Sequence, residues 1–449
     1  MLNRLDFNNK MTKNDKMYKS NCITMTKDNR DFIKIEIIKN ICIWLVIGIL
    51  IVSQLTNTVF ATMIVWNELD TIETVSNASE INLGIQSEAA ILMEETTGTI
   101  LYTKNEHTKL RPASVTKVMT LLLIMEALDD GRISLTDHVG CSERARKMGG
   151  SQIWLNETEK LTVHEMLKAI CVVSANDCTV AMAEHIAGSE EAFVQLMNDK
   201  AKSLGMNDTT FKNSHGIDED GHVTSAYDIA IMSRELSYKH PEIHEYTKIW
   251  MDTLRDGKSQ LVNTNKLIRF YSGATGLKTG STSLALFNLT ATATRNDMKL
   301  IAVVMKGPTS QQRFDDAKAL LDYGFANYAS ANVSRKGEVV QSIEIPKSKQ
   351  GKTDLIIEND YNVLVNKADK DKVEKEILID ENISAPLEYL QKVGTINYKL
   401  NGEIIGQGNI VSGSKVEEKK WDDFFAEVSG MFFRVGRWNL DSFKFVLNI

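Results

Sequence analysis

Between residues 87 and 329, hydrophobic and polar positions alternate with the period of β-strands in some stretches and the period of α-helices in others. Two short strand-like runs, 89–93 and 99–104, flank an acidic, threonine-rich turn, a pattern that predicts a β-hairpin. A helical pattern begins near Pro112, and its apolar residues cover most of the helix circumference, as in a buried helix. Further helices are predicted at 163–187, 190–204, 225–238 and 313–327, and buried strands at 286–292 and 298–305. We expect a compact mixed α/β region over 87–329.

The pattern changes after residue 329. Short alternating runs are separated by Gly, Asn, Asp and Lys turns, at 338–345, 354–357, 361–365, 374–379, 395–400 and 403–408. Such spacing is typical of antiparallel strands. The sequence therefore predicts a small β-rich domain over 335–412.

Aromatic and apolar residues recur at helical spacing in the last segment, 416–449. They fall at i, i+3, i+4, i+7, i+11 and i+14, on one face of a helix: Trp421, Phe424, Phe425, Val428, Phe432 and Val435. Basic residues follow at Arg434, Arg437 and Lys444. An amphipathic helix of this kind favours binding to a membrane surface. The alternative is a helix that packs on the β-rich domain.

The first 61 residues have the features of an export segment. Residues 1–39 carry a net charge of +4, and 40–67 contain no charged residue. The densest apolar run, 41–52, matches a signal-peptide core and is short of the ~20 residues that a membrane span needs. Small residues before Thr62 suit a cleavage site after Ala61, and 62–86 is then a polar linker. An uncleaved N-terminal anchor is the alternative.

Composition excludes several classes of protein. The 449 residues are 43% hydrophobic and 25% charged, which is typical of a globular chain. A net charge of −7 argues against a nucleic-acid binder, since no basic excess is available to neutralise phosphates. Five cysteines without a CxxC pair predict neither a disulfide framework nor a structural zinc site.

One candidate for chemistry is Ser114-Val-Thr-Lys117 at the start of the predicted buried helix. Residues at i and i+3 share a helix face, so the lysine can reach the serine hydroxyl. The helix start leaves the backbone N–H of Ser114 free to bind an oxyanion. A buried lysine beside other cations has a lowered pKa and can act as a base. A second SxxK pattern, Ser412 to Lys415, lies in a predicted loop and is not a candidate.

Two further candidates follow along the chain. Ser174-Ala-Asn176 interrupts an apolar helical pattern, and buried polar side chains there need partners. Lys278-Thr279-Gly280 places a cation, a hydroxyl and a glycine on a strand, where they can bind a carboxylate. Taken singly, each motif has an ordinary explanation, such as a helix cap or chance.

Together, the three motifs occur in the order SxxK, SxN, KTG that characterises penicillin-binding proteins and class A β-lactamases. The chain resembles the serine-type D-alanyl-D-alanine carboxypeptidases, the low-molecular-mass penicillin-binding proteins. The similarity covers 87–329 closely and includes 148–152, 181–188 and 224–228. It implies a β-lactamase/transpeptidase-like domain, an antiparallel sheet with helices, followed by a small β-rich domain and a C-terminal amphipathic helix.

The resemblance also implies residue roles. Ser114 would attack the carbonyl of the penultimate D-Ala of a peptidoglycan stem peptide, and Lys117 would take its proton. Ser174 and Asn176 would complete the proton network and hold the substrate amide. A β-lactam would acylate the same serine. The implied mechanism needs no metal and no cofactor.

The remaining implied residues bind the substrate. Lys278, Thr279 and Arg313 would receive the terminal carboxylate, next to Gly280. The backbone N–H groups of Ser114 and Ser281 would form the oxyanion hole. The family implies an exported enzyme at the outer face of the cytoplasmic membrane.

The sequence departs from the family pattern at two places. After KTG the family usually has an aromatic residue or His, then Thr, an acidic residue and Ala-Gly, whereas here the run is Ser281-Thr282-Ser283-Leu284-Ala285-Leu286. Ala175 replaces a common Gly in the second motif. A β-lactamase is the alternative enzyme, but no Glu for a deacylating water lies between Glu191 and Glu219. A catalytically weak wall-binding protein is another alternative, and penicillin labelling of Ser114 discriminates it.

Overall fold

The computed structural model describes residues 82–426 and 428–431 of the chain. The predicted export segment, 1–61, lies outside the described residues. So do most of the predicted linker and residues 432–449 of the predicted tail.

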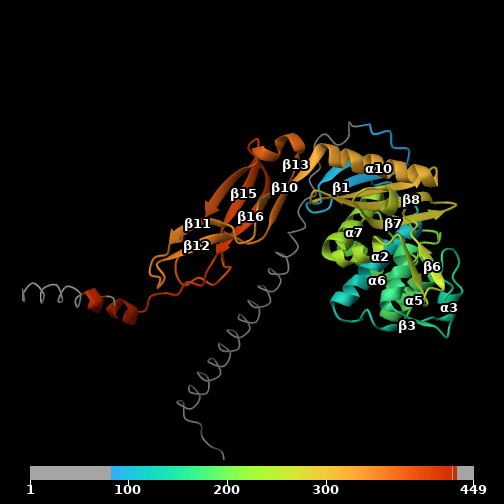
Figure 1. Cartoon of the computed structure of the whole chain (residues 1–449), viewed down its shortest axis with the longest axis horizontal. Helices are drawn as coiled ribbons and strands as arrows, with labels where there is room; N and C mark the ends of the chain where they lie inside the picture. The colour runs from blue at the N-terminus through green and yellow to red at the C-terminus, as the bar shows by residue number, and fades with distance from the viewer. Residues whose placement is uncertain (1–81, 427, 432–449) are drawn as a thin grey trace, which may run out of the picture. The chain divides into compact units, whose positions relative to one another are not determined.

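A five-stranded antiparallel sheet forms the centre of the first region, in the order β2-β1-β9-β8-β7 (Figure 1). The predicted hairpin is confirmed, since β1 (Ala89–Glu94) pairs with β2 (Ile100–Lys104). The predicted later strands are β8 (Leu286–Arg295) and β9 (Met298–Gly307), and β7 (Ala274–Thr282) pairs with β8 along one edge.

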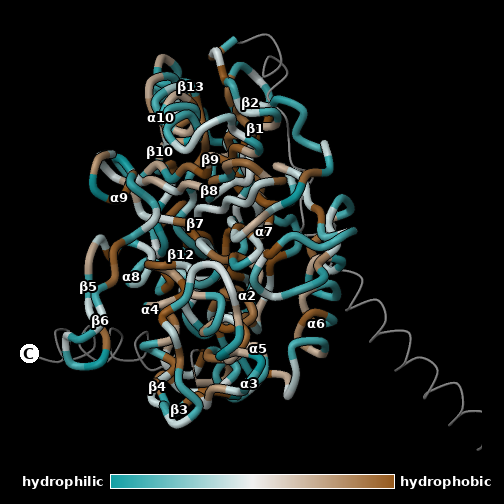
Figure 2. The backbone as a smooth tube through the Cα atoms, turned by 90° about the vertical axis from the view of Figure 1, so that its right-hand side faces the viewer, coloured by the Kyte–Doolittle hydropathy of each residue, from teal (hydrophilic) through white to brown (hydrophobic). Residues whose placement is uncertain are grey.

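Both faces of this sheet are covered, as β9 shows most clearly. Ile301, Val303 and Met305 point into a core shared with the helices of one face, whereas Leu300 and Val304 point into a second core. Side chains alternate across a strand, so a continuous apolar run buries both faces. Figure 2 shows hydrophobic segments gathered around β9 and near α2.

The helices on the first face are α2 (Lys117–Asp129), α4 (Val163–Val172), α5 (Asn176–Ala187), α6 (Glu190–Ser203) and α7 (Ala226–Lys239). The other face is covered by α10 (Ser310–Asn327). Hydroxyl caps explain several helix starts: Thr162, Ser189, Ser225 and Thr309 each accept a hydrogen bond from a backbone N–H three residues later. The predicted stretch 163–187 is two helices, because the chain leaves the helical conformation at Ser174.

Several short elements were not predicted. They are η2 (Ala113–Thr116), η3 (Pro241–Ile243), α3 (Glu143–Arg146), α8 (His244–Thr247), α9 (Leu267–Phe270), and the hairpins β3 (His138–Gly140) with β4 (Lys160–Thr162) and β5 (Met251–Leu254) with β6 (Ser259–Val262). Elements of three or four residues are too short to show a hydrophobic period.

The second region consists of β-strands, as predicted. One five-stranded sheet has the order β11 (Val339–Glu344), β12 (Lys352–Ile357), β16 (Glu403–Ser412), β15 (Lys392–Leu400) and β14 (Glu374–Ile379). A second sheet pairs β10 (Tyr328–Ser334) with β13 (Tyr361–Asn366), which precedes the short helix η4 (Lys367–Lys372). A separate hydrophobic core, including Leu355, Ile396 and Tyr398, fills this region.

The described part of the C-terminal tail is helical at 421–426 and 428–431. Trp421 and Phe425 on this segment are 79% and 70% exposed. Among the described residues, no helix is both long enough and apolar enough to cross a membrane.

Candidate active site

Ser114 lies in η2, between Pro112 and the long buried helix α2. The amide of Asn288 on β8 donates hydrogen bonds of 2.9 Å to the carbonyls of both Arg111 and Pro112. The hydroxyl of Thr116 closes the turn through a 2.8 Å bond to the carbonyl of Ala113. The turn that carries the serine is therefore tied both to the sheet and to itself.

Lys117, at the first position of α2, is fully buried and reaches three oxygen atoms. Its Nζ lies 3.1 Å from Ser114 Oγ, 2.6 Å from Asn176 Oδ1 and 2.6 Å from the backbone carbonyl of His215. The structure thus brings together the serine and lysine of the first motif and the asparagine of the second.

The surroundings of Lys117 favour its neutral form. Burial lowers the pKa of Lys117 well below its usual value, the positive charge of Lys278 lowers it further, and only Asp177 opposes them. A neutral amine has two N–H groups, and two fixed acceptors, Asn176 Oδ1 and the His215 carbonyl, are available for them. The remaining lone pair then points toward Ser114 Oγ, as a general base requires.

Ser174 and Asn176 lie where α4 ends and α5 begins. Ser174 adopts a φ of 63°, and within the described part of the chain its buried Oγ has no hydrogen-bond partner. A strained backbone and an unpaired buried hydroxyl are typical of functional sites. Asn176 is held on both sides, because its Nδ2 donates to the Gly149 carbonyl and its backbone N to the Ser151 carbonyl, each at 2.7 Å.

The third motif lies on the edge strand β7. Burial lowers the pKa of Lys278 to about 7, and the nearby charge of Arg313 contributes. The Nζ of Lys278 donates a 3.0 Å hydrogen bond to the Thr279 carbonyl, and the Thr279 hydroxyl lies 2.7 Å from the Thr264 hydroxyl. These two hydroxyls and Lys278, which a bound anion would protonate, make this part of the site suitable for binding a carboxylate.

Gly280 lies directly against the nucleophile turn. A Cβ atom at this position would be only 2.9 Å from the backbone nitrogen atoms of Ser114 and Val115. Any larger residue would therefore fill the space in front of the Ser114 N–H. Ser281 follows, with its side chain exposed near the end of β7.

Arg313 on α10 approaches the same strand from the other side. Its Nη1 donates to the Gly280 carbonyl at 3.2 Å and to the Asn288 carbonyl at 3.4 Å. Among the described residues its buried Nε has no partner, and burial lowers the pKa of Arg313 to about 10, so it stays charged at neutral pH. The predicted arginine is thus placed behind the third motif, where its charge acts on Lys278.

Sequence reasoning missed three contributors to this arrangement: the His215 carbonyl, Gly216 and Asn288. A Cβ at Gly216, where φ is +91°, would lie 1.9 Å from the Ala113 carbonyl oxygen, so only glycine fits. A glycine inside the polar run 213–217 was a detectable signal. A second was Asn288, a lone amide within an apolar strand pattern.

Comparison with known proteins identifies this arrangement. The family described as D-alanyl-D-alanine carboxypeptidase matches residues 74–309. The chain is 43% identical over 352 residues to the D-alanyl-D-alanine carboxypeptidase DacF of Bacillus subtilis, covering 78% of this chain and 90% of that protein. The chain belongs to the D-alanyl-D-alanine carboxypeptidase family.

Two further comparisons extend the family resemblance. Penicillin-binding protein 5, C-terminal domain, matches residues 328–418. The crystal structure of penicillin-binding protein 5 from Haemophilus influenzae superimposes with a TM-score of 0.65 at 32% identity, covering 74% of this chain and 98% of that chain. Penicillin-binding protein D2 of Listeria monocytogenes, in its ampicillin-bound form, gives 0.51 at 30% identity, covering 55% and 100%.

The departures from the carboxypeptidase pattern directly adjoin the proposed site residues. Ala175 has a φ of −60°, a conformation open to any residue, so glycine is not required there. The unusual run that begins at Ser281 forms the end of β7 and the turn into β8, with Leu284 58% exposed.

Proposed function

We propose that this carboxypeptidase removes the terminal D-Ala from peptidoglycan pentapeptides through an acyl-enzyme on Ser114. The observation that carries the proposal is the 3.1 Å separation of Lys117 Nζ from Ser114 Oγ, with the amine fixed by two other acceptors. This geometry supports direct proton transfer from the hydroxyl to the amine as the serine attacks.

The first half-reaction follows from these positions. Ser114 Oγ attacks the carbonyl of the penultimate D-Ala, and Lys117 takes its proton. The oxyanion that forms accepts hydrogen bonds from the backbone N–H groups of Ser114 and Ser281. The open space in front of the Ser114 N–H, which Gly280 preserves, supports this role. The peptide bond then breaks, and the leaving D-Ala amine needs a proton.

Ser174 and Asn176 serve the proton transfer and the substrate. The unpaired Ser174 hydroxyl can relay a proton from Lys117 to the leaving amine, and Asn176 holds both Lys117 and the substrate amide. The substrate's terminal carboxylate binds Lys278 and Thr279, supported by the charge of Arg313. A water molecule activated by Lys117 then hydrolyses the ester.

The same serine would be acylated by β-lactams. A relative of 30% identity, penicillin-binding protein D2 of Listeria monocytogenes, is known in ampicillin-bound and cefotaxime-bound forms. A β-lactam presents a reactive carbonyl and a carboxylate, which suit Ser114 and Lys278 respectively.

We further propose that the enzyme is exported and acts at the outer face of the cytoplasmic membrane. The basic N-terminus followed by an uncharged apolar segment supports export. The exposed aromatic residues of 421–431 support attachment of segment 416–449 to the membrane surface.

The function is tested by D-alanine release from a diacyl-Lys-D-Ala-D-Ala peptide, with fluorescent penicillin labelling in parallel. A fragment that begins at Thr62 should release D-alanine and become labelled, and Ser114→Ala should lose both activities. Retained labelling in Ser114→Ala would disprove the nucleophile. Labelling without release by the unsubstituted fragment would indicate a penicillin-binding protein rather than a carboxypeptidase, and rapid penicillin turnover a β-lactamase.

A further inference from the structure

The His215 carbonyl that accepts from Lys117 belongs to an irregular segment, 213–217, which needs external support to keep its position. Ser214 provides that support. Its backbone N and its hydroxyl donate to Glu190 Oε1 at 3.0 Å and 2.7 Å, and its carbonyl accepts from Thr120 Oγ1 at 2.6 Å. Ser214, the residue before His215, is therefore held at its backbone N–H, its hydroxyl and its carbonyl.

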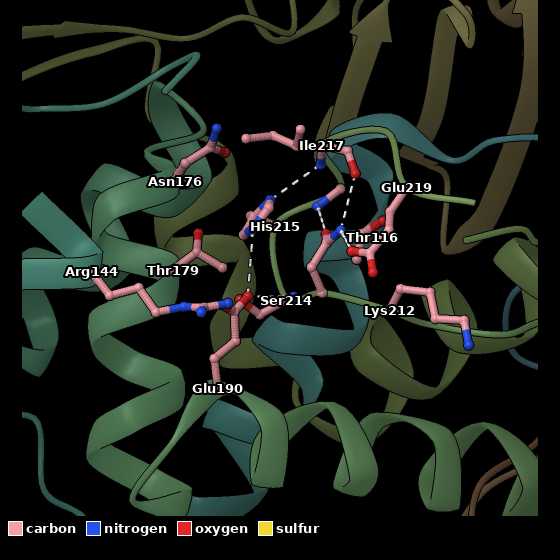
Figure 3. Close-up of polar contacts among 12 residues, drawn as sticks. Thr116, Arg144, Asn176, Thr179, Glu190, Lys212, Ser214, His215, Ile217 and Glu219 are labelled. Carbon is pink, nitrogen blue, oxygen red and sulfur yellow. Dashed lines mark hydrogen bonds and ion pairs between the residues drawn. The ribbon is translucent and has the colours of Figure 1, made fainter. Parts of the chain in front are cut away.

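Glu190 is the first residue of α6, and its side chain is only 1% exposed. Its second oxygen, Oε2, accepts from Nε of Arg144 at 2.8 Å and also from the Arg144 Nη2. Burial opposes ionisation, but the hydrogen bonds from Ser214 and the nearby positive charge keep the pKa of Glu190 below its usual value. A buried, ionised carboxylate thus accepts from two separate segments, as Figure 3 shows.

The His215 ring also faces this carboxylate. Its Nδ1 accepts from the Ile217 N–H at 3.1 Å, which places the ring proton on Nε2, 3.4 Å from Glu190 Oε1. Burial lowers the pKa of His215 to about 4, so the ring is neutral at neutral pH.

Arg144 connects the same carboxylate to the other acceptor of Lys117. Arg144 lies on α3, and the chain continues from there into the loop whose Gly149 and Ser151 carbonyls hold Asn176. Both groups that accept from Lys117 are therefore supported by segments that meet at Glu190.

We propose that Glu190 is a positioning residue for Lys117: it clamps the His215 carbonyl through Ser214 and braces the Asn176 loop through Arg144. The carboxylate touches neither substrate nor Ser114. The inference rests on the proposed function, because it assumes that Lys117 is the base. Its consequence is that the neutral amine of Lys117 keeps its lone pair on Ser114 only while the clamp is intact.

A clamp of this kind predicts a change in the pH profile that a general loss of stability does not. The charged groups that face Lys117 are Lys278 from β7 and Asp177 from α5, and the His215 ring is neutral. When the His215 carbonyl is released, the Lys117 ammonium loses an acceptor, so the pKa of Lys117 falls. The ascending limb of the pH profile of acylation then moves to lower pH, and the maximal rate falls. A smaller folded fraction would scale the profile without moving it.

The test measures the second-order rate of acylation by a fluorescent penicillin from about pH 5 to about pH 10. Glu190→Gln keeps the side-chain shape but faces Arg144 with an uncharged amide. Ser214→Ala keeps the Glu190 charge and removes one hydrogen bond. The matched control is Glu191→Gln, which alters the neighbouring glutamate, 73% exposed and 3.4 Å from the same arginine.

We expect Glu190→Gln to lower the maximal acylation rate about 10²-fold and Ser214→Ala about tenfold, both with the ascending limb at lower pH. Glu191→Gln should stay within about twofold of the unsubstituted protein. Wild-type rates and an unmoved limb in Glu190→Gln and Ser214→Ala would overturn the inference. If thermal unfolding shows that Glu190→Gln does not fold, wild-type behaviour of Ser214→Ala alone overturns it. Failure of the unsubstituted protein to be acylated would instead contradict the proposed function.

Discussion

At the scale of single residues, the proposed mechanism gives different roles to two buried lysines, Lys117 and Lys278. Lys117 has its pKa lowered by burial and by Lys278, which suits a base. Burial lowers the pKa of Lys278 to about 7, which suits a group that becomes charged when a carboxylate binds. The protonation of Lys117 thus depends on Lys278, because charging Lys278 disfavours the ammonium form of Lys117.

These shifts predict a bell-shaped pH dependence of kcat/KM for D-alanine release. Activity should rise as Lys117 loses its proton, and fall as the pH passes above about 7 and free Lys278 loses its charge. A bound substrate carboxylate raises the pKa of Lys278, so the descending limb of kcat should lie at higher pH than that of kcat/KM.

Lys278→Arg provides the check, since arginine stays charged at every pH of the assay. The variant should lose the descending limb near pH 7 while it keeps the ascending limb, when D-alanine release is followed across the pH range. A descending limb that does not move would show that another group controls substrate binding.

At the scale of the elements, the nucleophile turn depends on the strand beside it. Asn288 on β8 is fully buried, holds the Arg111 and Pro112 carbonyls and accepts from the Lys306 N–H at 2.7 Å. One side chain thus joins η2 to two neighbouring strands. The oxyanion-binding N–H that we assign to Ser114 is positioned by this amide.

Asn288→Ala should destabilise the fold and slow acylation together. Removing the amide takes away the partner of the Arg111 carbonyl and of the Lys306 N–H, and leaves the Pro112 carbonyl with only its 3.3 Å bond from the Val115 N–H. This loss should lower the free energy of unfolding by about 3 kcal/mol. Denaturant unfolding measures this loss. Asn332→Ala, at an exposed asparagine on β10 with one side-chain partner, is the control and should change it by less than about 0.5 kcal/mol. Equal stability of the two variants would contradict the structural role of Asn288.

The elements also show what a sequence can predict. Hydrophobic period predicted the hairpin at 89–104, the long helices and the later strands, because each is set by local spacing. The break at Ser174 was visible as polar residues within an apolar run. The glycine within 213–217 was visible in the same way, but the position of this segment could not be predicted, because it depends on Glu190, Thr120 and Ala113, which are distant in sequence.

The site could be predicted to a similar extent. The motifs predicted which side chains meet around Lys117. The role of the His215 carbonyl could not be predicted, because every residue has a backbone carbonyl and its position depends on the fold. The proposed positioning role of Glu190 could not be predicted either, because a glutamate at the start of a helix is common and usually exposed.

At the scale of the whole molecule, a carboxypeptidase domain is followed by a β-rich region and an exposed aromatic helix. Such an order suits an enzyme whose substrate is fixed in the cell wall and whose chain is held at the membrane. The helical residues 421–426 present Trp421, Phe424 and Phe425 to solvent, and among the described residues no helix is long and apolar enough to cross a membrane. The exposed aromatic side chains favour the proposed attachment of the tail to a membrane surface.

Removing residues 421–449 should release the mature protein from membranes and leave its activity on a soluble peptide unchanged within about twofold. Fractionation of cells that express each form measures this. Trp421→Ser with Phe425→Ser should release the protein as well, whereas the control Asp422→Ser on the same helix should not. A truncated protein that stays bound would place the attachment elsewhere, in an uncleaved N-terminal segment or the β-rich region.

The most direct test of the central claim is mass spectrometry of the peptide that contains Ser114 after incubation with penicillin. The account predicts one penicilloyl adduct, located on Ser114, that Lys117→Ala no longer forms at a measurable rate. An adduct on any other residue, or full acylation of Ser114 without Lys117, would contradict the assignment of Ser114 as nucleophile and Lys117 as its base.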